Sequence, residues 1–320
     1  MQCQFKILGG HMMKKWKITW VMLFLFPMAI GRSLAGSSPQ IGPAGTTPVS
    51  MVVSVEAKRG GEVPTISRED VRVYQDKDRV QVTAWVPLAE LELYVLIDDA
   101  AETNVGLQYD DLRQFMDAQP ATTAIAVGYI RFGTVEIVQK LTKDHSQAGK
   151  ALRLPMGVGA GTGSPYVSVE DLIKRWPESA ARHEILMITS GIDGLQGGPS
   201  DPYLLRAIER AQQAGVQVYA IYAPTIGHLG HSFWRIHWGQ ISLSQLAEET
   251  GGEAYFQNFQ APIAFSPFLE QIADRLKHQY RLTFLAKPEK NASYQHVRLE
   301  TEVPNADLIA ADRVYIPAAK

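Results

Sequence analysis

The stretch LELYVLIDDAAE, residues 91–102, decides the expected fold. Its first seven residues are mostly apolar and have the length of a buried strand. The apolar run then breaks into Asp98, Asp99, two alanines and Glu102. Clustered carboxylates after a strand are typical of a ligand site, because open α/β sheets bind ligands outside the carboxyl ends of their strands. The stretch therefore raises the question of whether this acidic turn holds a metal ion.

The chain that follows repeats a pattern of strand and helix. Strand-length apolar runs occur at 91–97, 123–133, 134–141, 183–191, 216–224 and 253–257. Amphipathic stretches that follow these runs predict helices at 109–118, 168–176, 201–215, 242–252 and 266–276. The alternation predicts an α/β fold, in which a doubly wound, mainly parallel sheet carries helices on both faces. This domain is expected to span 91–278, with its second and third strands joined as a hairpin across Gly133.

Two of the helices carry signals for where they begin. Asp201 and Pro202 occupy the expected N-cap and first-turn positions of the helix over 201–215, and Gly215 closes it. Ser168 and Asp171 have the spacing of a capping box, which predicts that the preceding helix begins near Ser168.

The segments on either side of this domain have a β pattern. Residues 49–90 and 279–320 both contain short runs that alternate between apolar and polar residues. Chain ends that flank a core are often close in space, so we expect these two segments to pack together. Residues 36–48 are rich in Gly, Pro and Ser and predict a flexible leader.

The first 35 residues predict a signal peptide. Basic residues at 13–17 precede an apolar run at 18–31, and small residues lead up to Ala35. The run is shorter than the roughly 20 residues that a membrane-spanning helix needs. We expect translation to start at Met12 or Met13, cleavage near Ala35, and a secreted or periplasmic protein with no membrane span after cleavage.

Composition and cysteine content exclude several classes of function. The chain of 320 residues is 46% hydrophobic and 20% charged, with a formal net charge of −2. This charge gives no electrostatic reason to expect a nucleic acid or an anionic membrane as partner. The only cysteine, Cys3, precedes the expected cleavage point, so the mature chain has no thiol for disulfides, zinc or nucleophilic catalysis.

The order of these motifs resembles the von Willebrand factor type A (VWA) domain of secreted bacterial proteins. Three features carry the resemblance: LYVLIDDAAE (93–102), EILMITSGIDG (184–194), and LAEETGGEAYF (246–256) with its double glycine after a late helix. The resemblance covers roughly residues 49–285. It implies a metal-ion-dependent adhesion site, in which Mg²⁺ is held by loop oxygens and a carboxylate of the partner completes the coordination.

Residue by residue, the metal site implied by the resemblance is degenerate. Asp98 matches the first Asp of the motif, but Ala100 replaces a serine and has no oxygen. Glu102 replaces a second serine, and Ser190 replaces an aspartate. Thr162 is the candidate for the threonine of the second loop.

Two interpretations of this degenerate site follow. Either the metal is lost and the acidic turn of Asp98, Asp99 and Glu102 is solvated, or Mg²⁺ still binds through Asp98, Glu102, Thr162 and Asp193. Mg²⁺ prefers six hard oxygen ligands, so the loss of donors favours the first interpretation.

A second candidate site lies in HLGHSFWRIHWGQ, residues 228–240. Its imidazoles could bind Zn²⁺ or Cu²⁺, although their spacing fits no familiar metal motif. Aromatic residues and arginine favour a partner-binding loop instead, because such residues anchor protein interfaces. The residues concerned are His228, His231, Trp234, His237 and Trp238.

The leading hypothesis is a non-enzymatic, extracytoplasmic protein-binding module without a functional metal site. Its binding face would lie at the carboxyl edge of the sheet, and the partner is expected to be a protein. The alternatives are a Mg²⁺-dependent adhesin-like module, a secreted hydrolase and a structural subunit of an envelope complex. The turn at Ser190 lacks the Gly-x-Ser-x-Gly elbow of a hydrolase, and the glycine-rich segment 157–164 lacks the lysine of a phosphate loop.

Overall fold

The computed structural model describes residues 45–157, 163–196, 198–257, 260 and 262–319. The expected signal peptide, Thr162 and most of the expected leader lie outside the described residues. All described residues belong to one compact unit, Gly42–Lys320. Within the described ranges, no helix is both long and apolar enough to cross a membrane.

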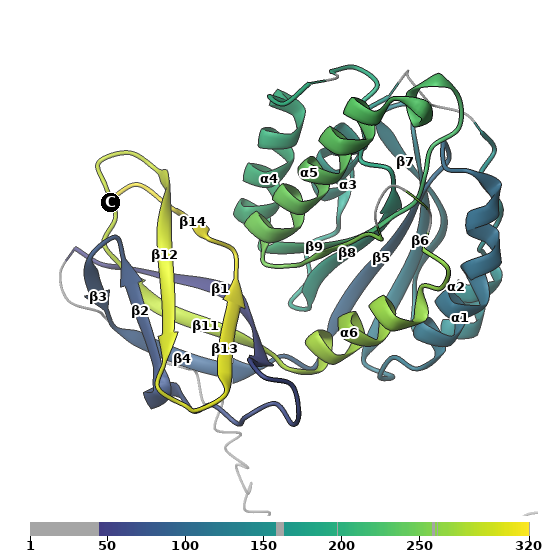
Figure 1. Ribbon diagram of the computed structural model, residues 1–320. Coiled ribbons are helices and arrows are strands. Elements are labelled where there is room, and N and C mark those ends of the chain that lie inside the picture. The colour runs from purple at the N-terminus through teal and green to yellow at the C-terminus, as the bar shows by residue number, and fades with distance from the viewer. Residues whose placement is uncertain (1–44, 158–162, 197, 258–259, 261, 320) are drawn as a thin grey trace, which may run out of the picture. The chain divides into compact units, whose positions relative to one another are not determined.

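A six-stranded sheet with the order β10-β9-β8-β5-β6-β7 forms the centre of the α/β segment (Figure 1). Its strands are β5 (Leu91–Asp98), β6 (Thr123–Arg131), β7 (Thr134–Thr142), β8 (Arg182–Thr189), β9 (Val216–Tyr222) and β10 (Ala254–Tyr255). All neighbours pair in parallel except β6 and β7, which form the expected antiparallel hairpin. Gly133 turns this hairpin with a φ of 78°, which glycine adopts without steric cost.

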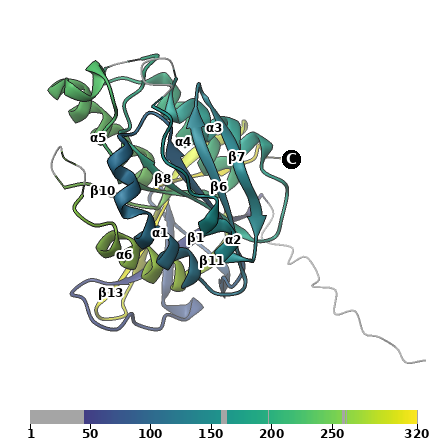
Figure 2. The same ribbon diagram turned by 90° about the vertical axis from the view of Figure 1, so that its right-hand side faces the viewer.

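Helices cover both faces of this sheet (Figures 1 and 2). One face carries α1 (Tyr109–Asp117), α2 (His145–Lys150) and α6 (Ser266–Lys277). The other carries α3 (Pro165–Arg175), α4 (Pro202–Ala214) and α5 (Phe233–Thr250). Short 3-10 turns are η1 (Arg68–Asp70), η2 (Thr103–Gln108) and η3 (His228–His231). The doubly wound α/β fold predicted from the alternating pattern is therefore confirmed.

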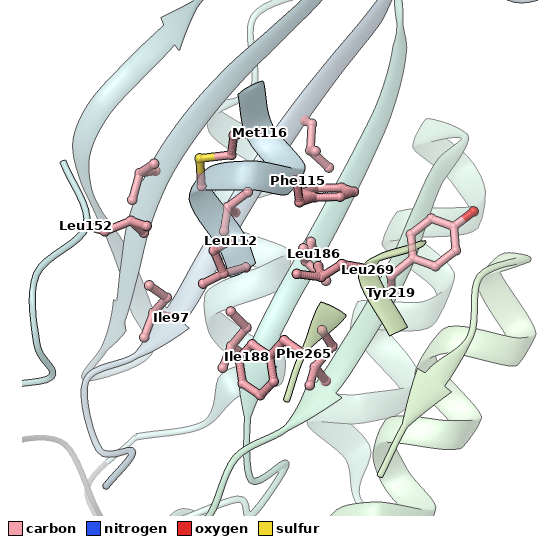
Figure 3. Packing of buried hydrophobic residues seen from close by; sticks show 14 of the residues in the cluster. Ile97, Leu112, Phe115, Met116, Leu152, Leu186, Ile188, Tyr219, Phe265 and Leu269 are labelled. Atoms are coloured by element: carbon pink, nitrogen blue, oxygen red, sulfur yellow. The ribbon is translucent and has the colours of Figure 1, made fainter. Parts of the chain in front are cut away.

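The two faces of the sheet are buried by apolar side chains at helical spacing. Figure 3 shows Leu112, Phe115 and Met116 of α1 packed near Ile97 of β5 and Ile188 of β8. Burial of an aliphatic or aromatic side chain of this size contributes about 1.5–3 kcal/mol relative to exposure. Packed side chains therefore cover both faces of the central strands. This packing holds in place the carboxyl ends of the strands, from which the loops start.

The beginnings of the helices were predicted with mixed success. The Asp201 carboxylate accepts hydrogen bonds from Tyr203 N and Leu204 N, which confirms it as the N-cap of α4. The capping box at Ser168 was wrong: α3 begins at Pro165, and Ser164 caps it by accepting from Val167 N. Pro165 at the first helical position suits this earlier start, because its missing N–H needs no partner there.

The expected loop over 228–240 is also different in the structure. It contains η3, and α5 begins at Phe233 instead of near residue 242. The first turns of α5 place aromatic residues on a partly exposed face, so they lack the apolar periodicity that marks a buried helix.

The flanking segments form two four-stranded sheets. One has the order β13-β1-β11-β4 and the other β14-β12-β2-β3. Their strands are β1 (Thr47–Ala57), β2 (Val71–Gln75), β3 (Asp78–Val80), β4 (Val82–Pro87), β11 (Gln279–Ala286), β12 (Ser293–Thr301), β13 (Ala306–Ala310) and β14 (Arg313–Ile316). Strands from both flanks pair directly, as β1 with β11 and β2 with β12. One shared hydrophobic core includes Val53, Val73 and Phe284.

Candidate functional site

The loops that follow β5 and β9 are bound to each other at the carboxyl edge of the sheet. Ile226 N and Thr225 Oγ1 both donate to the carbonyl of Ala100, each at 2.9 Å. Glu102 N donates to the carbonyl of Pro224, also at 2.9 Å. The acidic turn after β5 is therefore held by backbone hydrogen bonds, with both alanines buried inside it.

Asp98 ends β5 with its side chain 8% exposed. Its Oδ1 accepts from Ala100 N at 2.9 Å, and its Oδ2 accepts from the Thr189 hydroxyl at 2.7 Å. Burial raises the pKa of Asp98, and these two hydrogen bonds partly oppose that rise. Both oxygens are thus engaged by protein donors.

The other positions of the implied metal site supply few oxygens. Ala100 is buried and has none to give. The Glu102 carboxylate accepts from Asn104 Nδ2 at 3.0 Å, within its own loop. The Ser190 hydroxyl oxygen accepts from Ile192 N at 3.3 Å. Asp98, Ala100, Ser190 and Thr225 line a space of about 20 Å³, enough for about one water molecule.

These residues do not fit the donor set that Mg²⁺ requires. A magnesium ion takes six hard oxygens at near-octahedral angles, whereas the described side chains that line this space offer one carboxylate already bonded to two donors and the buried hydroxyls of Ser164, Ser190 and Thr225. In the part of the chain that the structure describes, no group of three or more His, Cys, Asp or Glu residues could hold a metal ion.

Asp99, predicted as part of the binding turn, has a different environment. It is fully buried and forms a bidentate pair with Arg153, at 2.7 and 3.0 Å. Met156 N donates to the same carboxylate, and the Arg153 guanidinium lies 3.7 Å from the Tyr129 ring centroid. Asp99 therefore anchors the loop before the glycine-rich segment. Sequence reasoning missed Arg153 because it is far from Asp99 along the chain and belongs to no motif.

Asp193 does not line the space at Asp98. Its Oδ1 accepts from Leu195 N at 2.6 Å and from Gln196 N at 3.0 Å, which closes a tight turn after β8. Asp193 and Asp201 line a second, separate cavity beside α5. Burial and the neighbouring Asp193 raise the pKa of Asp201 to about 6.

The histidines and tryptophans after β9 form a ridge of rings. Phe233 packs against Trp234 at 5.5 Å and against His237 at 6.2 Å, while Trp234 lies 6.3 Å from Trp238. Trp234 is 62% exposed. His228 and His231 lie on η3 with exposed side chains, and the structure does not bring them and His237 together as a metal group among its described residues.

Large apolar side chains are exposed around the same edge of the sheet. They come from the loops after β5, β6, β8 and β9. Two more come from the loop that Asp99 anchors, before the glycine-rich segment. This set, here named the apolar rim, consists of Leu107, Phe132, Leu154, Met156, Leu195, Phe233 and Trp234. An exposed apolar group of this kind is typical of an interaction surface. Only Trp234 of this rim belonged to the predicted site.

A serine, a histidine and a carboxylate also meet at the opposite end of the sheet. The Ser179 hydroxyl lies 3.1 Å from His183 Nε2, and Glu92 Oε2 lies 3.5 Å from the same nitrogen. A catalytic triad needs the serine and the carboxylate on different ring nitrogens. The shared nitrogen is therefore unsuitable for relaying a proton from Ser179.

The strand order, the hairpin at the β7 edge and the acidic turn after β5 define a VWA-like α/β fold. The chain is similar to an aerotolerance-related membrane protein of Bacteroides fragilis, with 12% identity over 58% of this chain and 98% of that chain and a TM-score of 0.41. It is also similar to the von Willebrand factor domain of the type V pili tip protein Mfa5 of Porphyromonas gingivalis, with 11% identity, 60% and 95% coverage and a TM-score of 0.38.

A further similar structure is the ArnB paralog VWA2 of Sulfolobus acidocaldarius. The identity is 12%, the match covers 86% of this chain and 76% of that chain, and the TM-score is 0.35. No protein-family model and no curated protein matches the sequence.

Proposed function

We propose that this protein is an extracytoplasmic, non-enzymatic binding module that engages a protein partner through the apolar rim, without a metal ion at Asp98. The apolar rim is the observation that carries the proposal. Its members surround the carboxyl edge, and Leu107 and Trp234 are 81% and 62% exposed. Tryptophan and phenylalanine in such positions are favoured anchors of protein interfaces, because they bury a large apolar area on binding.

The hydrogen bonds of Asp98 in the acidic turn after β5 support a metal-free mode of binding. A VWA-type metal ion needs open donor oxygens, but both oxygens of Asp98 are bonded to Thr189 and Ala100 N. Partner recognition would then depend on apolar burial around the loop.

Location outside the cytoplasm is supported by the sequence alone. The basic, apolar and small-residue order over 13–35 is that of a secretory signal. The absence of cysteine after Cys3 is compatible with an oxidising compartment.

Photo-cross-linking in cells tests the binding face. A photoreactive amino acid would be placed at Trp234 or Phe132 on the apolar rim, or at Leu205, an exposed control on α4. We expect discrete protein adducts at both rim positions and none at Leu205. Adducts of the same partner at Leu205, or adducts at neither rim position, would overturn the proposal.

A further inference from the structure

The sulfur atoms of the expected mature chain differ sharply in exposure. After the expected cleavage point near Ala35, the sequence has methionines at 51, 116, 156 and 187 and no cysteine. Met51, Met116 and Met187 each belong to a hydrophobic core and are 7%, 0% and 0% exposed, whereas Met156 is 55% exposed. An oxidant in solution therefore reaches the thioether of Met156 directly, and it reaches the other three only when the fold opens.

Met156 lies on the loop that Asp99 anchors. Its backbone N–H donates to Asp99 Oδ1 at 3.0 Å, and the same carboxylate forms the bidentate pair with Arg153. These bonds hold the loop through its backbone and through Arg153, without the side chain of Met156. A chemical change at the Met156 sulfur therefore leaves the anchor of the loop intact.

Two close approaches hold this loop against its neighbours on either side of Met156 in the chain. A Cβ atom at Gly106 would meet Leu154 Cδ2 at 2.2 Å, so Leu154 lies against the loop after β5. A Cβ atom at Gly157 would meet Ile226 Cδ1 at 3.1 Å, in the loop after β9. A partner that covers this part of the apolar rim therefore also covers the side chain of Met156.

We propose that Met156 is a redox-sensitive modification site, at which hydrogen peroxide forms the sulfoxide and thereby releases a protein partner from the apolar rim. The release, unlike the oxidation, rests on the proposed function. In the reaction a lone pair of the sulfur attacks one peroxide oxygen, the O–O bond breaks and an S–O bond forms. Sulfur is oxidised by two electrons, and the proton on the transferred oxygen passes to the departing hydroxide, which leaves as water.

The sulfoxide changes the polarity of this part of the apolar rim. It is a polar hydrogen-bond acceptor, whereas the thioether is apolar and only a weak acceptor. Burial of a polar group without a hydrogen-bond partner costs free energy. Leu107 and Leu154, the rim members on the two loops in contact, have no side-chain donor to offer. A partner surface that packs against the thioether therefore binds the sulfoxide more weakly.

Peptide mass spectrometry of the secreted, purified protein tests the oxidation. After brief treatment with hydrogen peroxide at neutral pH, we expect one added oxygen at Met156 before any at Met51, Met116 or Met187. Met156→Leu should gain no oxygen in the same time, and a methionine sulfoxide reductase with a thiol should restore the parent. Oxidation that spares Met156, or that is equal at all four methionines in the folded protein, would overturn the proposal.

The photo-cross-link at Phe132, a rim position on another loop, tests the release. In peroxide-treated cells its yield should fall at least fivefold in the parent and less than twofold in Met156→Leu, each compared with its own untreated value. Met156→Gln, which places a polar side chain of similar length at this position, should give at least fivefold less adduct than Met156→Leu without any oxidant.

Two results would overturn the release and leave the proposed function standing. One is an equal fall of the yield in the parent and in Met156→Leu, which would place the sensitive group on the partner. The other is an equal yield in Met156→Gln and Met156→Leu. An untreated parent without any adduct would instead overturn the proposed function, and the release with it.

Discussion

At the scale of single residues, adjacent carboxylates in one turn have unlike roles. Asp98 is bonded to Thr189 and to the backbone of its own turn, and Asp99 is paired with Arg153 on the other side. The sequence indicated acidic residues at the end of a strand. It contained no sign of their directions, because Thr189 and Arg153 come from segments that only the folded sheet brings near.

The Asp99–Arg153 pair yields the first prediction. Asp99→Ala should lower the free energy of unfolding by about 3 kcal/mol, because Met156 N–H loses its acceptor and the partly buried guanidinium loses its bidentate partner. The guanidinium then keeps only the Leu154 carbonyl and the Glu136 carboxylate 3.9 Å away. Urea unfolding measures the change. The double variant Asp99→Ala with Arg153→Met should recover part of the loss, since no unpaired charge remains. A loss below about 1 kcal/mol in Asp99→Ala would show that the pair is not structural.

Glu184 yields a prediction about pH. It is fully buried on β8, its oxygens accept no hydrogen bond from a described residue, and Arg182 Nε lies 3.4 Å away. Burial raises its pKa to about 7 from an ordinary 4.5. The folded state therefore holds the proton more tightly than the unfolded state, and stability falls as the pH rises through this window.

The variant Glu184→Gln should remove that dependence. At pH 8 it should be more stable than the parent by up to about 3 kcal/mol, and near pH 4.5 the two should agree within about 1 kcal/mol. Denaturant unfolding at a series of pH values measures the difference, in which the other titrating groups cancel. A constant difference across the series would contradict the raised pKa.

At the scale of elements, α5 is held against the turn after β8 by a glycine. A Cβ atom at Gly239 would meet the Ser190 carbonyl oxygen at 2.6 Å. Gly191 has a φ of 68°, and a Cβ atom there would meet the Gly239 carbonyl oxygen at 2.5 Å. The close approach explains why glycine occupies the interior of a helix, where alanine is better by about 1 kcal/mol.

Gly239→Ala should therefore destabilise the protein by about 1–3 kcal/mol, because the added Cβ must push α5 away from the sheet. This result would be opposite to the stabilisation that the higher helix propensity of alanine alone would give. Gly149→Ala in α2 is the matched control. There the new Cβ would meet only the Arg113 residue, with its flexible side chain nearest at 3.2 Å, and stability should stay level or rise. Thermal unfolding of the two variants measures both effects, and a stabilised Gly239→Ala would refute the close approach of α5 as the reason for this glycine.

The elements differ in how well sequence predicted them, and capping chemistry explains the difference. Asp201, Pro202 and Gly215 act within a few residues of the helix ends they mark, so the bounds of α4 followed from local rules. Ser168 also has the sequence spacing of a cap, but Ser164 caps α3 instead, because Pro165 favours the first helical position that follows it. The start of α5 escaped notice because Phe233 and Trp234 face outward, where periodicity does not reveal a helix.

At the scale of the whole molecule, alternating strands and helices were sufficient to predict the doubly wound sheet. The spacing of apolar residues and the lengths of the connections between strands can be read directly from consecutive residues. Parallel strands joined by helices can be arranged in only a few topologies, because their crossover connections are almost always right-handed. The apolar rim could not be predicted in the same way. Leu107, Phe132 and Leu195 are separate single residues in the sequence, and only the sheet gathers their loops at one edge.

The acidic turn after β5 predicts a weak response of the melting temperature to magnesium. Millimolar Mg²⁺ should raise the melting temperature of the protein no more than it raises that of Asp98→Asn, because a ligand stabilises a native state only by binding it. Differential scanning fluorimetry in buffers of equal ionic strength measures both. A clear rise in the parent that Asp98→Asn abolishes would support the metal-dependent alternative.

The signal peptide expected over residues 13–35 predicts the beginning of the mature chain. Expressed from Met12 or Met13 in a secreting bacterium, the protein should be recovered outside the cytoplasm with Gly36 as its first residue. Mass spectrometry of the intact protein identifies that residue. A chain that retains residues 13–35 would contradict cleavage near Ala35.

The central claim is that a protein partner binds the apolar rim without a metal ion at Asp98. Its most direct test is the yield of the photo-cross-link at Trp234 in the parent and in the Asp98→Asn variant, compared at equal expression. The account predicts the same adduct at the same yield in both. Loss of the adduct in Asp98→Asn, with folding intact, would contradict it and would place the binding function in a metal site.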